Sequence, residues 1–431
     1  MIRGLSTILV VLLLGAGTLG GGVAAGQEGY ETPPILQASE LLPAEMLHGD
    51  NFEVAPDVTN DGFMNLYEVT SEYGDFTAYG DLELAKLIHQ VGAIAELDEV
   101  SATDQFLEAA GHTVTDQLDT AKNVAEHPVE ITKALPKGIF HMFRKYKIAA
   151  ETGVHAATAL VGDEDEETDP TAGYADVWAA VTDTERDWYH KLELDPYHHN
   201  EVLREAVSHV AKVDVIASVG MSFAPVPSIP GASYLGEVTE AVWTTDPSEL
   251  REQNIERLQV AGVGDELIGR FMDNGFISPT QQTLTATALG QIEGVDGLEV
   301  LLEISAQADS LELAQFDIAN TMLLAAYHRE VAPLATIFPG APVPVAIDNA
   351  GGLVILVSAD YAFWVDDLAP VIGIMAGRFA DRDAASREIW LRGKASPRFV
   401  AEVGELGWDV RRSVDLEAKM SGDSSQVARN R

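Results

Sequence analysis

The chain has 431 residues, of which 46% are hydrophobic and 22% are charged, and it contains no cysteine. This length supports one large domain or two ordinary ones and excludes disorder along the whole chain and a small disulfide scaffold. Without cysteine there are no thiolate nucleophiles, cysteine-ligated metals or disulfide-linked partners. Acidic residues outnumber basic ones 68 to 27, for a net charge of −41. Such a charge repels phosphate backbones, so nucleic acid is not expected as a partner.

Residues 1–25 have the three parts of a secretory signal peptide. Arg3 supplies the positive start, residues 5–19 form the apolar middle, and Val23-Ala24-Ala25 provides small residues for a cleavage site. The apolar run is shorter than the roughly 20 residues that span a membrane. We therefore expect cleavage near Ala25 and a periplasmic or secreted protein of the bacterial envelope. An uncleaved membrane anchor remains the alternative.

The acid-rich composition has two interpretations. Dispersed acidic residues are typical of adaptation to salty surroundings, where screening weakens the repulsion between like charges. The alternative is that the acidic residues bind cations. Because these residues are spread along the chain, the sequence favours the first interpretation.

The first half of the chain predicts an extended lead, a small hairpin and then helices. Residues 26–60 contain several prolines and show little periodicity, whereas residues 66–80 alternate in polarity around Gly74, as a β-hairpin does. Helices are expected near residues 84–95, 102–128 and 138–161, which makes 61–162 a helical region with a small hairpin. Residues 163–173 form an acidic loop, with six acids among the first seven positions.

Residues 174–338 are predicted to be a second helical region, because capping residues mark several helix starts. Asp246-Pro247 and Ser278-Pro279 each combine an N-cap acceptor with a proline in the first turn, and Asn200 precedes a third helix. A long helix is expected to start near Ser310 and to end near Pro333.

Residues 339–420 change character and predict a small α/β module. Residues 344–347 and 353–357 resemble strands, 361–379 a helix, and 388–392 and 408–412 two strands separated by a helix that Ser396 caps. Residues 421–431 are expected to be a flexible tail. The predicted fold class is therefore α+β and mainly α: a helical body with an N-terminal β-hairpin and a C-terminal α/β module.

Several short motifs resemble an uncharacterised family of bacterial exported proteins. They are Gly80 with the helix after it, Asp195-Pro196-Tyr197 with Asn200 and Leu203-Arg204, residues 276–282, Ser396-Pro397-Arg398, and Gly407-Trp408. The resemblance is spread over residues 60–415 and consists of caps and turns. It implies one exported unit, and it carries over no activity and no catalytic residue.

A group of histidines is the densest candidate for metal chemistry. His198 and His199 precede a helix on which Glu205 and His209 lie one turn apart, and nitrogen and carboxylate ligands suit zinc or another divalent metal. The alternative is structural: Asp195-Pro196 stops a helix, and His198 and His199 are exposed turn residues. Apart from this divalent metal, no cofactor is predicted.

One basic segment, within a predicted helix and its approach, is the candidate for contact with a membrane surface. Bases and bulky apolar residues interleave there, as in helices that lie on anionic membranes. The candidate residues are Lys137, Phe140, Phe143, Arg144, Lys145 and Lys147. The alternative is a core helix whose bases pair with acids of this acidic chain.

Common catalytic signatures do not occur in the sequence: it has no His-Glu-x-x-His helix, no Gly-x-Ser-x-Gly elbow and no phosphate-binding Gly-Lys-Ser/Thr loop. The leading hypothesis is a non-catalytic exported envelope protein that acts through an envelope partner or the membrane surface. A metal-dependent hydrolase with its site near residues 198–209 is the first alternative, and a solute-binding protein is the second. The sequence identifies no catalytic residue.

Overall fold

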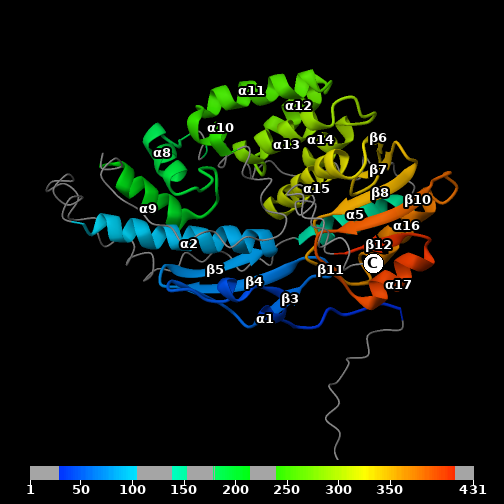
Figure 1. Cartoon of the computed structure of the whole chain (residues 1–431), viewed down its shortest axis with the longest axis horizontal. Helices are drawn as coiled ribbons and strands as arrows, with labels where there is room; N and C mark the ends of the chain where they lie inside the picture. Colours follow the sequence, from blue (N-terminus) through cyan, green and yellow to red (C-terminus); the bar gives the residue numbers. More distant parts are fainter. Residues whose placement is uncertain (1–28, 104–137, 153–177, 179, 214–238, 413–431) are drawn as a thin grey trace, which may run out of the picture.

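The computed structural model describes residues 29–103, 138–152, 178, 180–213 and 239–412 (Figure 1). Helix predominates over strand in these ranges, and the strands form separate sheets, which confirms the predicted α+β, mainly α class. None of the helices in these ranges has the length and hydropathy of a membrane-spanning segment. The predicted signal peptide, the acidic loop at 163–173 and the tail at 421–431 lie outside the described residues.

The N-terminal part is an antiparallel sheet of short strands. Its strands are β1 (Leu36–Gln37), β2 (Phe52–Val54), β3 (Asp57–Asn60), β4 (Asn65–Ser71) and β5 (Gly74–Tyr79), with α1 (Ala38–Leu41) and the 3₁₀ turn η1 (Ala44–Met46) between β1 and β2. β4 and β5 are the predicted hairpin. Residues 36–60, which were expected within an extended lead, instead add three strands to it. These strands have only two to four residues, too few for a visible alternation. Pairing with β4 holds β2 and β3 in place, and pairing with β3 holds β1.

A long helix, α2 (Asp81–Ser101), covers this sheet and connects it to the next layer (Figure 1). The first half of α2 packs on the sheet through Leu84, Leu87, Ile88 and Val91. Its second half packs against α8 (Asp183–Lys191) and α9 (Glu201–Ala211) in a separate apolar cluster. The predicted Asn200 cap is present, since its side chain accepts from the Leu203 N–H at 3.2 Å.

The middle of the molecule is a group of helices around α13 and α15. Its members are α10 (Thr239–Thr244), α11 (Pro247–Val260), α12 (Asp265–Met272), α13 (Pro279–Gln291), α14 (Glu299–Ser305) and α15 (Leu311–Glu330). Asp246 and Ser278 cap α11 and α13 as predicted, and Ser310, near which a helix start was predicted, caps α15. Most side chains of α13 and α15 are buried, so these two helices form the centre of the main core.

The C-terminal part is the predicted α/β module. Its sheet has the order β12-β10-β8-β7-β6, made of β6 (Leu334–Phe338), β7 (Val345–Asp348), β8 (Gly352–Val357), β10 (Ser386–Leu391) and β12 (Asp409–Arg411). β8, β10 and β12 are parallel, connected by α16 (Ala369–Arg378) and α17 (Pro397–Glu405). The module starts at Leu334, a few residues before the predicted boundary. Residues 361–362, expected at the start of a helix, form β9 (Tyr361–Ala362), which pairs with β11 (Lys394–Ala395).

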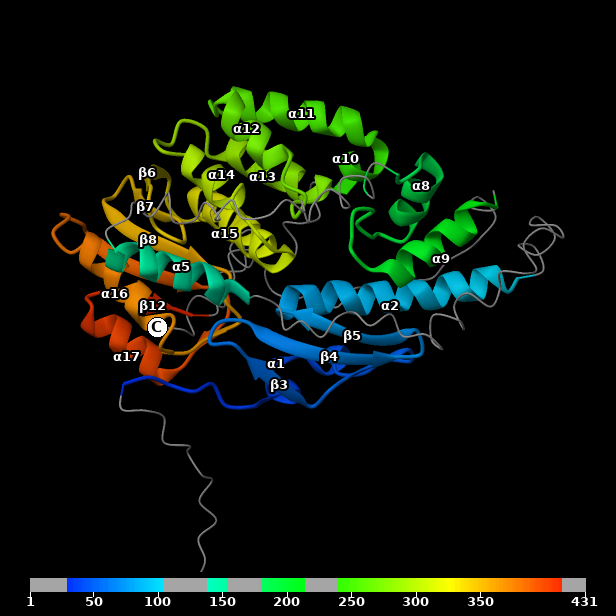
Figure 2. The ribbon, with the colours of Figure 1, turned by 180° about the vertical axis from the view of Figure 1, so that it is seen from behind.

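Helices cover both faces of this sheet (Figure 2). Ile355 and Val357 of β8 line a small apolar cavity together with residues of α16, α17 and α5 (Gly138–Thr152). On the opposite face, the Tyr327 ring of α15 contacts the Trp390 ring of β10 at 5.1 Å between centroids. Because both faces are covered, every residue of β8 is buried, which explains its uninterrupted apolar sequence.

The first described residues return to the C-terminal module. The Glu31 N–H donates to the Trp364 carbonyl at 2.7 Å, and the Glu31 carboxylate accepts from the Trp364 N–H and the Ser396 hydroxyl, each at 2.6 Å. The amino end of the described chain is therefore held at the start of α17, in the C-terminal module.

Candidate functional site

The N-terminal sheet meets the C-terminal module at the loop between β3 and β4. The Phe63 carbonyl accepts from the N–H groups of Asp360 and Tyr361, both at 3.1 Å, and the Phe363 N–H donates to the Gly62 carbonyl at 2.8 Å. Residues about 300 positions apart thus share backbone hydrogen bonds. We call this region the junction.

A buried ion pair lies at the centre of the junction. Asp360 follows β8 and Arg392 follows β10, and because these neighbouring strands are parallel, both residues lie at the same sheet edge. The Arg392 guanidinium donates to Asp360 Oδ1, and their side chains are 5% and 0% exposed. Gly393 is required beside this pair, since a Cβ there would lie 2.0 Å from the Asp360 carbonyl oxygen.

The second oxygen of Asp360 binds the N-terminal part. Oδ2 accepts from the backbone N–H of Asn65 at 3.0 Å and of Asp81 at 3.3 Å. Gly80, with φ +100°, turns the chain from β5 into α2 and brings the first N–H of that helix to the carboxylate. Helix N-termini stabilise negative charge, so the start of α2 supports Asp360.

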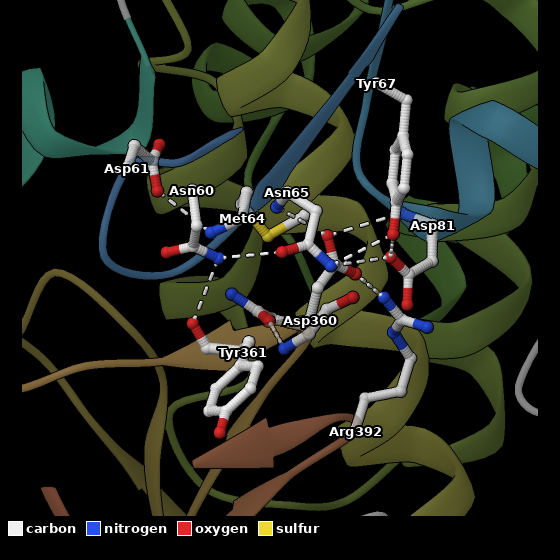
Figure 3. A network of polar contacts seen from close by, with 11 residues as sticks. Asn60, Asp61, Met64, Asn65, Tyr67, Asp81, Asp360, Tyr361 and Arg392 are labelled. Carbon is white, nitrogen blue, oxygen red and sulfur yellow. Dashed lines mark hydrogen bonds and ion pairs between the residues drawn. The ribbon is translucent and has the colours of Figure 1, made fainter. Parts of the chain in front are cut away.

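A second carboxylate, Asp81, lies beside this pair (Figure 3). The Tyr67 hydroxyl donates to Asp81 Oδ1 at 2.7 Å, the Asn65 amide donates to the same oxygen at 3.0 Å, and Asn60 donates to Asn65 at 2.9 Å. Burial, followed by the charge of Asp81, raises the pKa of Asp360, while Arg392 opposes this shift. Burial and Asp81 also raise the pKa of Tyr67, so its hydroxyl stays protonated and keeps donating.

A pocket of about 70 Å³ lies next to the ion pair. Its walls come from the start of α2, from α13 and α15, and from the ends of β8 and β10, where Ser358 and Arg392 contribute. The polar lining also includes Glu83, Lys86, Gln281, Glu312 and Gln315. The apolar lining includes Met64, Leu82, Leu284, Phe316, Ile318 and Met322. The pocket therefore combines a few polar groups with a mainly apolar wall, the usual composition of a small-molecule site.

The predicted metal set is not assembled as a site in the described residues. His198 is 8% exposed and uses both ring nitrogens: Nδ1 accepts from the Asn200 N–H at 3.1 Å, and Nε2 lies 3.0 Å from the Tyr189 hydroxyl. The His199 ring packs edge-on against Trp178, and Glu205 is exposed on α9. Within the described ranges, no group of three histidine or acidic side chains is placed to hold a metal ion.

His198 and His199 are also not exposed turn residues, which was the structural alternative. The turn after Asp195-Pro196 folds inward, and the Asp195 carboxylate accepts from the Tyr197 N–H and from the Thr280 hydroxyl. Burial is the largest cause that lowers the pKa of His198 to about 3 and of His199 to about 4. Burial, followed by Lys212, also lowers the pKa of His209.

The predicted membrane-surface residues lie on a helix packed into the protein. Phe143 is 2% exposed, and its ring contacts that of Phe63 at 5.8 Å. Arg144 pairs with Asp367 and Lys145 with Asp309, each at 2.9 Å, while Lys147 is half-buried. Lys137 and the side chain of Phe140 lie outside the described residues. This packing favours the alternative of a core helix whose bases pair with acids.

One further carboxyl is buried away from the junction contacts. Asp317 on α15 is 2% exposed, and neither of its oxygens has a hydrogen-bond partner in the described part of the chain. Burial, followed by the charge of Asp309, raises the pKa of Asp317 well above its usual value. This side chain is therefore expected to stay neutral where other carboxyls ionise.

Sequence reasoning missed the junction. It treated Arg392 as the end of a strand and gave no role to Asp81, Glu312 or Asp360. A signal was available, because Ser358 to Asp360 and Arg392 directly follow two strand-like runs, and ligands of α/β sheets bind at the carboxyl ends of parallel strands. Recognising it required knowing that these two strands are neighbours.

No family model matches this chain, and neither a curated protein nor a solved structure matches it. The fold and the junction therefore carry the functional argument by themselves.

Proposed function

We propose that this protein is a non-catalytic binding protein of the bacterial envelope, which holds a small ligand in the junction pocket. The observation that carries the proposal is the pocket, where polar and apolar groups from three parts of the chain converge beside a buried ion pair. Sites between structural units, and sites at the carboxyl ends of parallel strands, are where small ligands commonly bind. The proposal therefore adopts the second alternative from the sequence, a solute-binding protein.

The charged side chains at the pocket favour binding over chemistry. Lys86 pairs with Glu83 at 2.7 Å, and Arg392 is held by Asp360. A fixed, buried pair such as that of Arg392 and Asp360 orients a ligand at no cost in reorganisation. A general acid or base must also reach its substrate, whereas Asp360, whose pKa burial raises to about 7, is fully buried behind Arg392 and does not line the pocket. Binding is therefore the function that these contacts support best.

The export part of the proposal rests on the sequence. Residues 1–25 have the pattern of a cleavable signal, and a net charge of −41 suits salty surroundings. The proposal predicts a mature chain that starts at Gly26 in the periplasmic or secreted fraction, which mass spectrometry of the N-terminal peptide would test. The expected envelope partner stays a prediction.

The binding proposal is tested by filling the pocket. Ala319 lies on the α15 wall, so Ala319→Leu should occupy the space that a ligand needs. Ligand-observed NMR with a set of neutral and charged fragments of five to seven non-hydrogen atoms should find binders of the unaltered protein that Ala319→Leu rejects. Ala211→Leu, at a similarly half-buried alanine at the end of α9, is the matched control and should keep them. If no fragment distinguishes the two variants, the proposed function is wrong.

A further inference from the structure

We propose that the junction pocket selects a small organic cation, namely a short alkylammonium group. This inference rests on the proposed function and names the class of its ligand. It follows from the charges around the pocket, from the chemistry of the apolar wall and from the size of the space.

Carboxylates outnumber bases at this site. Glu83 and Glu312 lie on the pocket wall, and Asp360 and Asp81 lie behind Arg392, so four carboxylates surround two cations. With Asp360 ionised the surplus is two negative charges, and with Asp360 protonated it is one. A positive ligand is attracted in either state.

Glu312 is the carboxylate best placed to receive that ligand. It belongs to the first turn of α15 and forms no ion pair or hydrogen bond with any group in the described part of the chain. Glu83, by contrast, is already paired with Lys86. A ligand ammonium would therefore complete the charge balance at Glu312, and the side-chain oxygen of Gln315 on the same wall can accept another of its N–H groups.

An anionic ligand has no equivalent partner. Arg392 is 5% exposed at its side chain, and its guanidinium is held by Asp360 with Asp81 close by. Lys86 is held by Glu83. Both bases are thus already neutralised by nearby carboxylates, so an anion entering the pocket would be repelled.

The apolar wall fits the other end of such a ligand. Phe316 offers a ring, and Met64 and Met322 offer polarisable thioethers. Aromatic rings attract cations, and methionines adapt to the shape of alkyl groups. A bare metal ion would gain little from these side chains, and the described residues place no set of three ligands for one.

The space limits the ligand to a few atoms. A volume of about 70 Å³ has room for about five water-sized atoms, if each needs roughly 10–15 Å³. Butan-1-amine and butan-1-ol each have five non-hydrogen atoms, and butanoate, with six, is the anion with the same four-carbon chain. The amine and the alcohol therefore separate charge from size, and butanoate reverses the sign of the charge.

The test is an NMR titration of the full-length mature protein with each compound at low salt. We expect butan-1-amine to bind about tenfold more tightly than butan-1-ol, butanoate to show no binding, and added salt to weaken the amine alone. Glu312→Gln should reduce amine affinity about tenfold and leave butan-1-ol unchanged. Glu299→Gln, at an exposed acid in the first turn of α14, is the matched control and should change neither.

Three results would overturn the inference, and each can be distinguished from the others. If butan-1-ol or butanoate binds as tightly as the amine and Ala319→Leu abolishes that binding, the pocket binds ligands but does not select cations, and the proposed function stands. If none of the three binds while other fragments are rejected by Ala319→Leu, the ligand class is again wrong. If the wider fragment set also fails, both proposals are wrong together.

Discussion

The histidine-rich turn before α9 and the junction differ in how chemistry is distributed along the chain. The turn gathers His198, His199 and Glu205 within a few residues, yet His198 uses both ring nitrogens in structural hydrogen bonds. The junction draws Asp81, Asp360 and Arg392 from distant positions into one buried network. Nearness in sequence therefore did not assemble a set of convergent polar groups here, whereas the meeting of two parallel strand ends did.

The two regions also differ in how they manage charge. The histidine turn excludes charge, because burial keeps His198 and His199 neutral. The junction contains it, because a guanidinium and backbone N–H groups compensate a fully buried carboxylate. Adding a charge, by protonation in acid, should therefore destabilise the histidine turn, whereas removing a charge by substitution should destabilise the junction.

The largest effect is expected from breaking the junction pair. Arg392→Met leaves Asp360 and Asp81 buried without their cation, and removing one partner of a buried pair costs about 3–5 kcal/mol. Urea unfolding followed by circular dichroism would measure this loss. The control is Arg411→Met, whose side chain is 55% exposed and whose pair with Glu388 should contribute less than about 1 kcal/mol. Equal losses of stability in the two variants would mean that the buried pair of Asp360 and Arg392 contributes no more than an exposed ion pair.

A second substitution sharpens this result. Replacing both partners, as Asp360→Leu with Arg392→Met, removes the uncompensated charge. The double variant should be more stable than Arg392→Met alone. A double variant that is less stable than Arg392→Met would contradict our account of the cost.

Acid should weaken the histidine turn. The pKa of His198 is about 3 in the folded protein, against about 6.5 when exposed, so the unfolded chain takes up a proton first as pH falls. The stability from this side chain is present above pH 6.5 and is lost towards pH 3, at about 1.4 kcal/mol per pH unit. His198→Gln should remove this dependence. The difference in unfolding free energy between this variant and the unaltered protein should therefore change by about 3 kcal/mol between pH 6.5 and pH 4.

Urea unfolding at several pH values measures this difference. His48→Gln, at an exposed histidine, is the control and should leave the pH dependence as it is. If His198→Gln and His48→Gln give parallel curves, then His198 does not couple folding to pH.

Asp317 should show the reverse dependence, with a smaller effect. Its pKa is raised, so the folded state favours the protonated form, and stability from this group is present below pH 3.8 and is lost as pH rises. Asp317→Asn mimics the protonated form at every pH. We expect it to match the unaltered protein near pH 4 and to be more stable than the unaltered protein at pH 7. A variant that is less stable at pH 7 would show that the carboxylate has a favourable role.

The smallest effect is expected on α5, outside both regions. The Arg144 side chain is 57% exposed in its pair with Asp367, so Arg144→Ala should cost less than about 1 kcal/mol in thermal or urea unfolding. The same variant tests the membrane-surface prediction through sedimentation with vesicles of anionic lipid. Weaker sedimentation would support that prediction despite the burial of Phe143.

Local chemistry was readable from the sequence, and long-range chemistry was not. The caps at Asn200, Asp246, Ser278 and Ser396 were predicted because each acts on backbone groups within three residues. The strand–helix–strand order of the C-terminal module was predicted from its alternation of apolar runs. The strands within residues 36–60 were not, since β2 and β3 are stabilised by pairing with β4, and β1 by pairing with β3, rather than by their own patterns.

The junction lay beyond sequence reasoning for a related reason. Asp360 and Arg392 become partners only when β8 and β10 pair in parallel, and Asn65 and Asp81 join them only when the two sheets dock. Phe143 was likewise placed on a membrane face, because its burial depends on Phe63 in a distant loop. Each of these residues has an ordinary local environment and acquires its role from tertiary contacts.

The docking of the first sheet onto the last strands has a consequence for the order of folding. The Asn65 and Asp81 amides that bind Asp360 lie 295 and 279 positions before it. During synthesis from the amino end, the amides of Asn65 and Asp81 therefore have no Asp360 carboxylate to bind until most of the chain has been made. Folding would then finish in one late step, in which the first sheet docks on the C-terminal module. A chain truncated before β10 should persist as a protease-sensitive intermediate.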